Sequence, residues 1–118
     1  ENLCAAENVG VIGFYSLASG FLTGKYRSKA DMEGRIRAPR VEKYVTEDGF
    51  RVLDALDAVA KKHNAKMGQV ALAWLMARPS VTSPIASATN MDQLAELTAT
   101  VELSLDADDI AKIDEASK

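Results

Sequence analysis

Residues suited to covalent or metal chemistry are scarce in this chain of 118 residues, which has one cysteine and one histidine. The lone cysteine, Cys4, excludes a disulfide framework within the chain and favours a reducing, cytoplasmic setting. One cysteine and one distant histidine cannot form a usual zinc site, so no metal is expected. No apolar run approaches the roughly 18 residues of a membrane span, and we expect no membrane contact.

Signatures of common catalytic sites are also absent. No serine lies in a G-x-S-x-G elbow, and neither a Walker A motif nor a G-x-G-x-x-G fingerprint occurs. The acidic pairs at residues 108–109 and 114–115 fall in a helix expected to be exposed, where solvation is their ordinary role. His63 lies near a helix end, where a structural role is expected. We therefore predict no catalytic residue.

The charges are unevenly distributed. Hydrophobic residues make up 47% of the chain and charged residues 26%, as in an ordinary globular domain. Residues 25–43 hold seven cations and three anions, although the net charge of the whole chain is −3. A basic segment confined to one short stretch argues against nucleic-acid binding, which requires a broad basic face. It suits either a solvated charged loop or one small anionic ligand such as a phosphate.

Short apolar runs alternate with amphipathic segments, which predicts an α/β fold with parallel strands. Strands are expected at residues 9–15, buried on both faces, and at residues 81–86, where Pro84 indicates an edge or an end. Because two strands cannot complete such a sheet, we expect residues 1–118 to be one segment of a larger domain. Helices are expected at residues 1–7, 43–63 and 68–78, from Asn90 and from Asp106, with a mobile loop at residues 31–40.

Ligand-binding residues are expected after both strands, where open α/β sheets and barrels place their binding loops. The first such segment, FYSLASGFLTGKY at residues 14–26, combines aromatics, small residues, hydroxyls and a lysine. That combination suits a flat ring followed by a pyrophosphate. The alternative is a turn rich in glycine and serine with no ligand.

The second segment, residues 85–96, leads from a strand into the N-terminus of a helix. Backbone N–H groups at such a terminus bind anions, and the hydroxyls of Ser87 and Thr89 can donate to phosphate oxygens. Gln93 and Glu96 lie three residues apart on one helix face and suit the amine and ring nitrogens of adenine. The alternatives are a helix cap for Gln93 and a solvated position for Glu96.

Three motifs, in matching order and spacing, resemble the C-terminal portion of the aldo-keto reductase family over essentially the whole chain. YSLASGFLTGKYR at residues 15–27 is similar to the loop after the family's seventh strand, Y-S-P-L-A-x-G-x-L-T-G-K-Y. QVALAWL at residues 69–75 resembles the helix before the eighth strand. SPIASAT at residues 83–89, followed by Gln93 and Glu96, resembles the eighth-strand loop and its helix.

The resemblance implies the C-terminal part of a (β/α)8 TIM barrel that transfers hydride from NADPH to the carbonyl of an aldehyde or ketone, with NADP preferred over NAD. The aromatic residue that ends strand seven would stack on the nicotinamide, the first loop would wrap the pyrophosphate, and the second would meet the adenosine end. The implied cofactor-binding residues are Phe14, Tyr15, Ser16, Leu17, Ser19, Thr23, Lys25, Arg35, Ser87, Thr89, Gln93 and Glu96.

Some positions depart from the family pattern. Arg37 or Arg40 could replace Arg35, because the length of that loop varies in the family. Some relatives carry Lys and Arg on the second loop for the ribose 2′-phosphate, whereas this chain has Ser87 and Gln93 there. The family's catalytic tyrosine, lysine, aspartate and histidine belong to earlier strands, and no residue here matches them. We therefore expect the 118 residues alone to be inactive.

Two other functions stay open. A non-catalytic nucleotide-binding regulatory subunit, resembling potassium-channel β subunits, uses the same barrel. A self-assembling partial barrel would instead cover its exposed strand edges by association. For the enzyme, the expected partners are a small carbonyl substrate and the remainder of the barrel.

Overall fold

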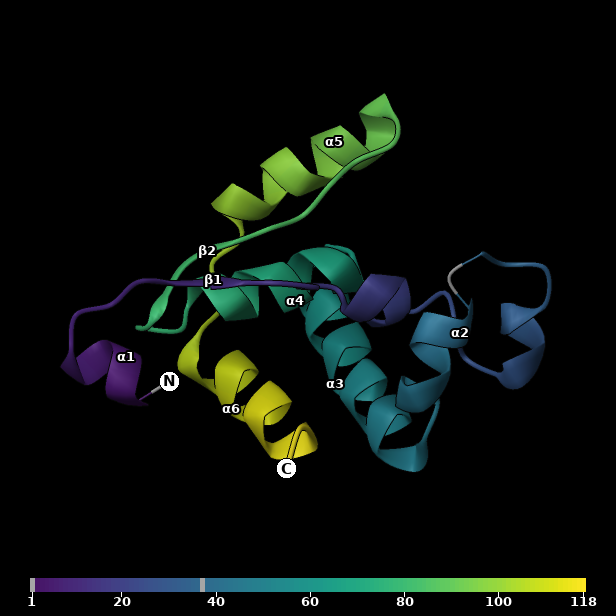
Figure 1. The fold of residues 1–118 in the computed structure, drawn as a ribbon, viewed down its shortest axis with the longest axis horizontal. Coiled ribbons are helices and arrows are strands. Elements are labelled where there is room, and N and C mark those ends of the chain that lie inside the picture. The colour runs from purple at the N-terminus through teal and green to yellow at the C-terminus, as the bar shows by residue number, and fades with distance from the viewer. Residues whose placement is uncertain (1, 37) are drawn as a thin grey trace.

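A pair of short parallel strands lies beside a group of helices (Figure 1). The computed structural model describes residues 2–36 and 38–118. The strands are β1 (Val11–Gly13) and β2 (Val81–Pro84). The α-helices are α1 (Asn2–Ala6), α2 (Ala38–Val41), α3 (Glu47–His63), α4 (Met67–Met76), α5 (Met91–Ala99) and α6 (Ala107–Ala116). The 3₁₀ helices are η1 (Ala18–Thr23), η2 (Lys29–Met32), η3 (Glu42–Tyr44) and η4 (Thr100–Glu102).

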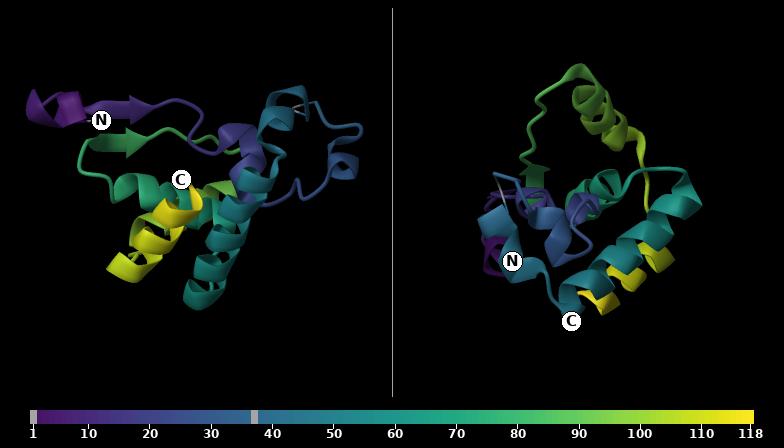
Figure 2. Two further views of the ribbon diagram at one scale, coloured as in Figure 1. Left: turned by 90° about the horizontal axis from the view of Figure 1, so that it is seen from below. Right: turned by 90° about the vertical axis from the view of Figure 1, so that its right-hand side faces the viewer.

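The parallel pairing of β1 with β2 confirms the predicted strand direction. Val11 lies opposite Val81 and Gly13 opposite Pro84, which ends β2. Both strands are shorter than predicted, and the expected burial of β1 on both faces is wrong, because Ile12 is 60% exposed. In the left view of Figure 2, helices α3, α4 and α6 lie together on one side of the strand pair.

Helix α3 supplies the largest part of the hydrophobic core. Thr46 caps its start, which lies after the predicted residue 43, by accepting a hydrogen bond from the Gly49 N–H. The helix ends at His63 as predicted, and Asn64 follows in a left-handed conformation. Its apolar face recurs at helical spacing and packs against α4, α6 and the segment after β1. The core comprises Phe21, Tyr26, Val41, Leu53, Leu56, Val59, Ala60, Val70, Ala71 and Ile113.

Helices α4 and α5 begin close to the predicted residues and differ in how much they bury. In α4, residues 70–73 are buried, whereas Met76 near its end is 38% exposed. Asn90 caps α5 by accepting a hydrogen bond from the Gln93 N–H at 2.9 Å. No residue of α5 is buried, and Figure 1 shows this helix standing apart from the others. The position of α5 therefore depends on contacts other than apolar burial.

A cluster of charges joins the end of α3 to the start of α6 and corrects the prediction that Asp109 is solvated. Asp109 is 3% exposed. It accepts a hydrogen bond from Lys62 Nζ at 2.8 Å and lies 2.6 Å from His63 Nε2. The expected structural role of His63 is thereby confirmed. Asp114 is likewise engaged, because it accepts a hydrogen bond from Trp74 Nε1 at 2.8 Å.

Among the described residues, no helix is both long and apolar enough to cross a membrane.

The Asp109 cluster predicts a specific loss of stability in acid. Burial raises the pKa of Asp109, but hydrogen bonds from Lys62 and His63 outweigh it and lower that pKa to about 2. Because the folded-state pKa lies below the usual value of 3.8, the stabilisation is complete above about pH 4 and is lost as the pH falls toward the folded-state pKa.

We predict that Asp109→Asn lowers the urea midpoint at neutral pH and flattens its fall in acid. The urea midpoint of the wild-type protein should decrease steeply over the same acidic interval. Asp108→Asn, which changes the exposed neighbour in the same helical turn, serves as the control and should follow the wild-type curve. Parallel curves for Asp109→Asn and the wild type would contradict this role for Asp109.

Candidate functional site

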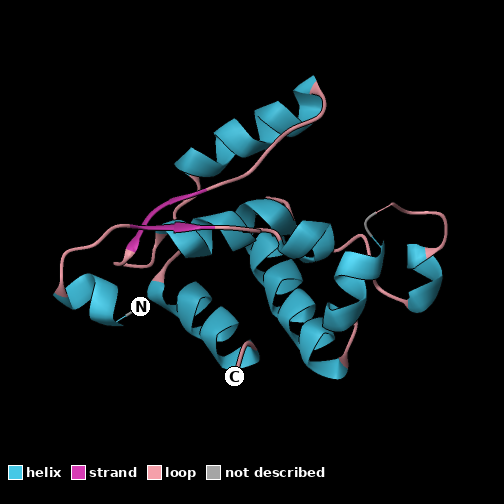
Figure 3. Ribbon diagram, viewed as in Figure 1, coloured by secondary structure: helices cyan, strands magenta, loops and turns pink. Residues whose placement is uncertain are grey.

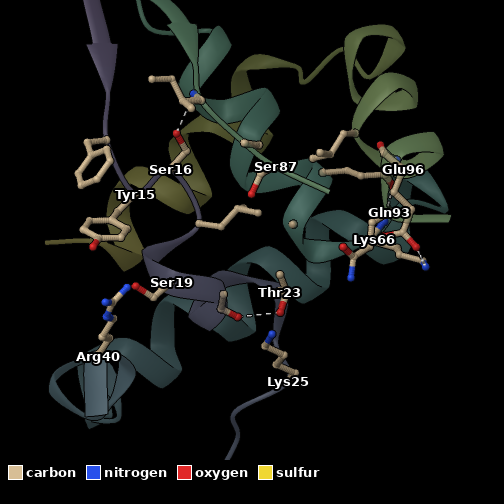
Figure 4. A pocket seen from close by; sticks show the side chains of 18 residues that line it. Tyr15, Ser16, Ser19, Thr23, Lys25, Arg40, Lys66, Ser87, Gln93 and Glu96 are labelled. Atoms are coloured by element: carbon tan, nitrogen blue, oxygen red, sulfur yellow. Dashed lines mark hydrogen bonds and ion pairs between the residues drawn. The ribbon is translucent and has the colours of Figure 1, made fainter. Parts of the chain in front are cut away.

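A pocket of about 560 Å³ lies where the two strands end (Figure 4). That volume falls in the range of small-molecule sites, which is about 300–1,000 Å³. Its lining comes from the residues after β1, from α2, from the start of α4, from the residues after β2 and from α5. Of the residues predicted to bind a ligand, the pocket brings together Phe14, Tyr15, Ser16, Leu17, Ser19, Thr23, Lys25, Ser87, Gln93 and Glu96.

The strand pairing explains why these distant segments meet. Parallel neighbours present their carboxyl ends at the same edge of a sheet, so the loops that leave β1 and β2 must start side by side. Figure 3 shows the loop after each strand in pink, running from the magenta strand to the next helix. The hydroxyl of Ser16 joins the two loops: it donates to the Gly13 carbonyl at 3.3 Å and accepts from the Ile85 N–H at 3.1 Å.

The backbone of the first loop is held in an unusual conformation. Tyr15, Ala18 and Ser19 have positive φ angles of 58°, 48° and 59°, and Gly20 follows with 97°. Positive φ is uncommon for residues other than glycine, and such residues cluster at ligand-binding sites. At Gly20 a side chain would also meet Lys25, since a Cβ placed there lies 3.0 Å from Nζ. The backbone of this loop therefore turns sharply where it lines the pocket.

Aromatic rings form one end of the pocket. The rings of Phe14 and Tyr15 lie 4.2 Å apart between centroids at an interplanar angle of 49°. Both side chains are exposed, at 78% for Phe14 and 52% for Tyr15. Figure 4 shows Tyr15 and Arg40 on one side of the pocket, with Lys66, Gln93 and Glu96 gathered on the opposite side. The pocket therefore has an aromatic end and a separate polar end.

The polar end depends on side chains of α5 that are held by hydrogen bonds. The Gln93 Oε1 accepts from the Thr89 N–H at 2.8 Å and from the Thr89 hydroxyl at 3.0 Å. Gln93 therefore joins α5 to the loop before it, while Thr89 supports Gln93 and does not itself line the pocket. The carbonyl of Glu96 accepts from Gln69 Nε2 at 2.9 Å, and its carboxylate pairs with Lys66 Nζ.

The start of α4 contributes residues that sequence reasoning missed, namely Lys66, Gly68 and Gln69. A signal for them was available. Helix α4 is separated from β2 by only a short turn, so it runs back along the strand. Ten helical residues span about 15 Å, close to the length of a short strand, which places the start of such a helix near the carboxyl end of the strand.

The three arginines considered for the basic loop are placed differently. The guanidinium of Arg35 lies 5.4 Å from the ring centroid of Tyr26 and does not line the pocket. Arg40, on α2, does line it. Arg37 lies outside the described residues. Of the two of these arginines that the structure describes, Arg40 lines the pocket and Arg35 does not.

Residues 2–36 and 38–118 contain no group of three or more histidine, cysteine, aspartate or glutamate side chains that could hold a metal ion.

Almost the whole amino-acid sequence matches the model of one protein family. A model of the aldo/keto reductase family aligns with residues 2–118. The chain belongs to the aldo/keto reductase family.

Curated relatives agree with this assignment. The L-glyceraldehyde 3-phosphate reductase of Escherichia coli O157:H7 is 34% identical over 116 residues, which cover 92% of this chain and 34% of the relative. The aldo-keto reductase yakc of Schizosaccharomyces pombe, whose name specifies NADP(+), is 30% identical over 96% of this chain and 34% of its own length. A probable voltage-gated potassium channel subunit beta of Oryza sativa is 31% identical over 80% of this chain and 30% of its own length. The chain spans about a third of the length of these relatives.

The anchoring of α5 can be tested at Gln69. Replacing Gln69 with Leu removes the hydrogen bond to the Glu96 carbonyl, worth about 1 kcal/mol. We predict that amide hydrogens of residues 91–99 then exchange with deuterium about fivefold faster. Thr98→Val is the control, since the Thr98 hydroxyl bonds only to carbonyls within α5. Exchange in α5 that Gln69→Leu leaves at the wild-type rate would contradict the anchoring.

Proposed function

We propose that the protein that carries this chain is an NADPH-dependent oxidoreductase that reduces an aldehyde or ketone, and that this chain binds much of the cofactor. The observation that carries the proposal is the pocket built jointly by the loops after β1 and β2. In this proposal β1 and β2 are strands seven and eight of a (β/α)8 barrel, whose ligand sites lie at the carboxyl ends of the strands.

The described residues fit a nicotinamide dinucleotide. Such a cofactor has a flat ring at one end, a charged pyrophosphate in the middle and adenosine at the other end. The pocket offers the ring of Tyr15, with the Phe14 ring against it, at one end and the amide and carboxylate of Gln93 and Glu96 at the other. The hydroxyl of Thr23 donates to the Gly20 carbonyl at 2.7 Å, which fixes the first loop close to the phosphate position proposed here.

Cations supply the remaining complementarity. Among the described residues, three cations line the pocket: Arg40 on α2, Lys66 directly before α4, and Lys25. Charge-assisted hydrogen bonds from lysine and arginine are the usual means of holding phosphate groups. In this proposal the positive charge of residues 25–43 helps to bind the cofactor phosphates, a function that a merely solvated loop would not have.

The chemical role of this chain is to bind and to orient. When bound, NADPH supplies the hydride, and a proton donor from another part of the protein completes the reduction of the carbonyl to an alcohol. Phe14 and Tyr15 orient the nicotinamide by contact with its ring face. The strained loop at residues 15–20 holds its backbone in place before the cofactor arrives, which lowers the entropic cost of binding.

A regulatory subunit is the second candidate function, and the potassium-channel β relative favours it. The same pocket would then hold a dinucleotide without turnover. Steady oxidation of NADPH that depends on an added aldehyde or ketone supports the enzyme. Binding of NADPH with no carbonyl-dependent oxidation, across a panel of aliphatic and aromatic carbonyls, supports the regulatory subunit.

The aromatic end of the pocket gives a direct mutational test. Phe14→Ala removes ring stacking worth about 1 kcal/mol, so we predict that the Kd for NADPH rises about fivefold. Titration of the full protein, followed by fluorescence of the reduced nicotinamide, measures this change. Val101→Ala removes an exposed apolar side chain from η4, away from the pocket lining, and should leave the Kd unchanged. Equal affinities for Phe14→Ala and the wild type would exclude Phe14 from the site.

A further inference from the structure

The polar end of the pocket carries a cation that comes from neither strand-end loop. Helix α5 contributes Gln93 and Glu96 there, and neither side chain is a cation. Lys66, which directly precedes α4, lines the same pocket. Figure 4 shows Lys66 beside Gln93 and Glu96, on the side of the pocket opposite Arg40.

We propose that Lys66 is the specificity-determining residue that lets this protein distinguish a dinucleotide with a ribose 2′-phosphate from one without it. The proposal rests on the cofactor binding proposed above and names the side chain that gives the site its preference for NADPH. A 2′-phosphate adds negative charge at the adenosine end of the cofactor. A cation at the polar end of the pocket therefore contacts the one group that differs between the two cofactors.

The position of Lys66 is set by contacts on both sides of its side chain. Its backbone N–H donates to Gln69 Oε1 at 2.9 Å, and Gln69 Nε2 donates to the Glu96 carbonyl at 2.9 Å. Its ammonium pairs with the Glu96 carboxylate. These contacts hold the ammonium between α4 and α5, next to the residues proposed to receive adenosine.

The ion pair with Glu96 leaves Lys66 accessible to a phosphate. The Lys66 side chain is 66% exposed and that of Glu96 is 36% exposed. An ammonium carries three N–H donors, so a phosphate oxygen can bind one donor while the carboxylate keeps another. Glu96 in turn lowers the attraction of Lys66 for anions, which makes the two side chains separable by mutation.

Lysine-to-methionine substitution removes the charge and keeps most of the side-chain volume. We expect Lys66→Met to raise the Kd for NADPH about tenfold in the full protein at low ionic strength, because a charged hydrogen bond is lost. The Kd for NADH should change by less than about twofold, because NADH lacks the phosphate that the lost charge contacts. Lys66→Arg, which retains the charge, should keep the wild-type preference.

Two further variants separate this effect from general damage. Lys61→Met removes an exposed lysine of α3 that pairs with Asp57 at 2.6 Å, outside the pocket lining, and should leave both affinities unchanged. Glu96→Gln breaks the same ion pair but keeps Lys66. It should preserve or increase the ratio of the NADH Kd to the NADPH Kd, even where both affinities fall.

The outcomes separate the two proposals. A wild-type protein that binds neither dinucleotide overturns the proposed function and the role of Lys66 together. A wild-type protein that binds both with equal affinity, or a Lys66→Met variant that weakens both equally or neither, overturns the role of Lys66 alone. A selective loss of NADPH affinity in Lys66→Met, restored in Lys66→Arg, supports it.

Discussion

Parallel pairing of β1 with β2 is the constraint on which the rest of the arrangement depends. It brings the carboxyl ends of two strands together although almost seventy residues separate them in the sequence. The loops that leave those ends then share one edge and form one pocket. The crossover between the strands must return the chain to the starting edge, and the helices α3 and α4 make that return while forming the core.

Apolar burial and polar anchoring hold different parts of the structure. Helices α3, α4 and α6 share a core of buried side chains. Helix α5 has no buried side chain. Its polar contacts with the rest of the structure include those made by its own Glu96 carbonyl, Glu96 carboxylate and Gln93. Elements with few buried apolar contacts open at lower free energy than core elements. The helix that contributes the polar end of the pocket is thus attached by the hydrogen bonds and the ion pair that also shape that end.

Local sequence patterns predicted helix boundaries well where residues close in sequence determine those boundaries. The end of α3 before Asn64 and the start of α5 at Asn90 each depend on neighbouring residues and agree with the predicted boundaries, whereas α3 starts after its cap Thr46 and not at the predicted residue 43. Asp109 was mispredicted because its burial results from packing against the end of α3, which no local pattern reveals. The exposure of Ile12 has a similar origin, since burial of a strand face depends on which other elements cover it.

In the candidate site, too, some residues could be predicted from local sequence and others are placed only by the fold. The two strand-end loops were predicted from their composition and from a family resemblance, and the structure brings ten of their residues to one pocket. Lys66 and Gln69 were missed because they follow a long helix and are distant in sequence from both loops. Arg40 could be separated from Arg35 only by the fold of the described residues 26–36 and 38–41, where Arg35 lies over the ring of Tyr26 instead.

A hydrogen–deuterium exchange footprint of the full protein, with and without NADPH, tests the central claim that both strand-end loops form one cofactor site. The account predicts slower exchange on binding in residues 14–25 and in residues 85–97 together, with residues 107–116 of α6 unchanged. Protection of only one of the two loops, or protection confined to other parts of the protein, would contradict it.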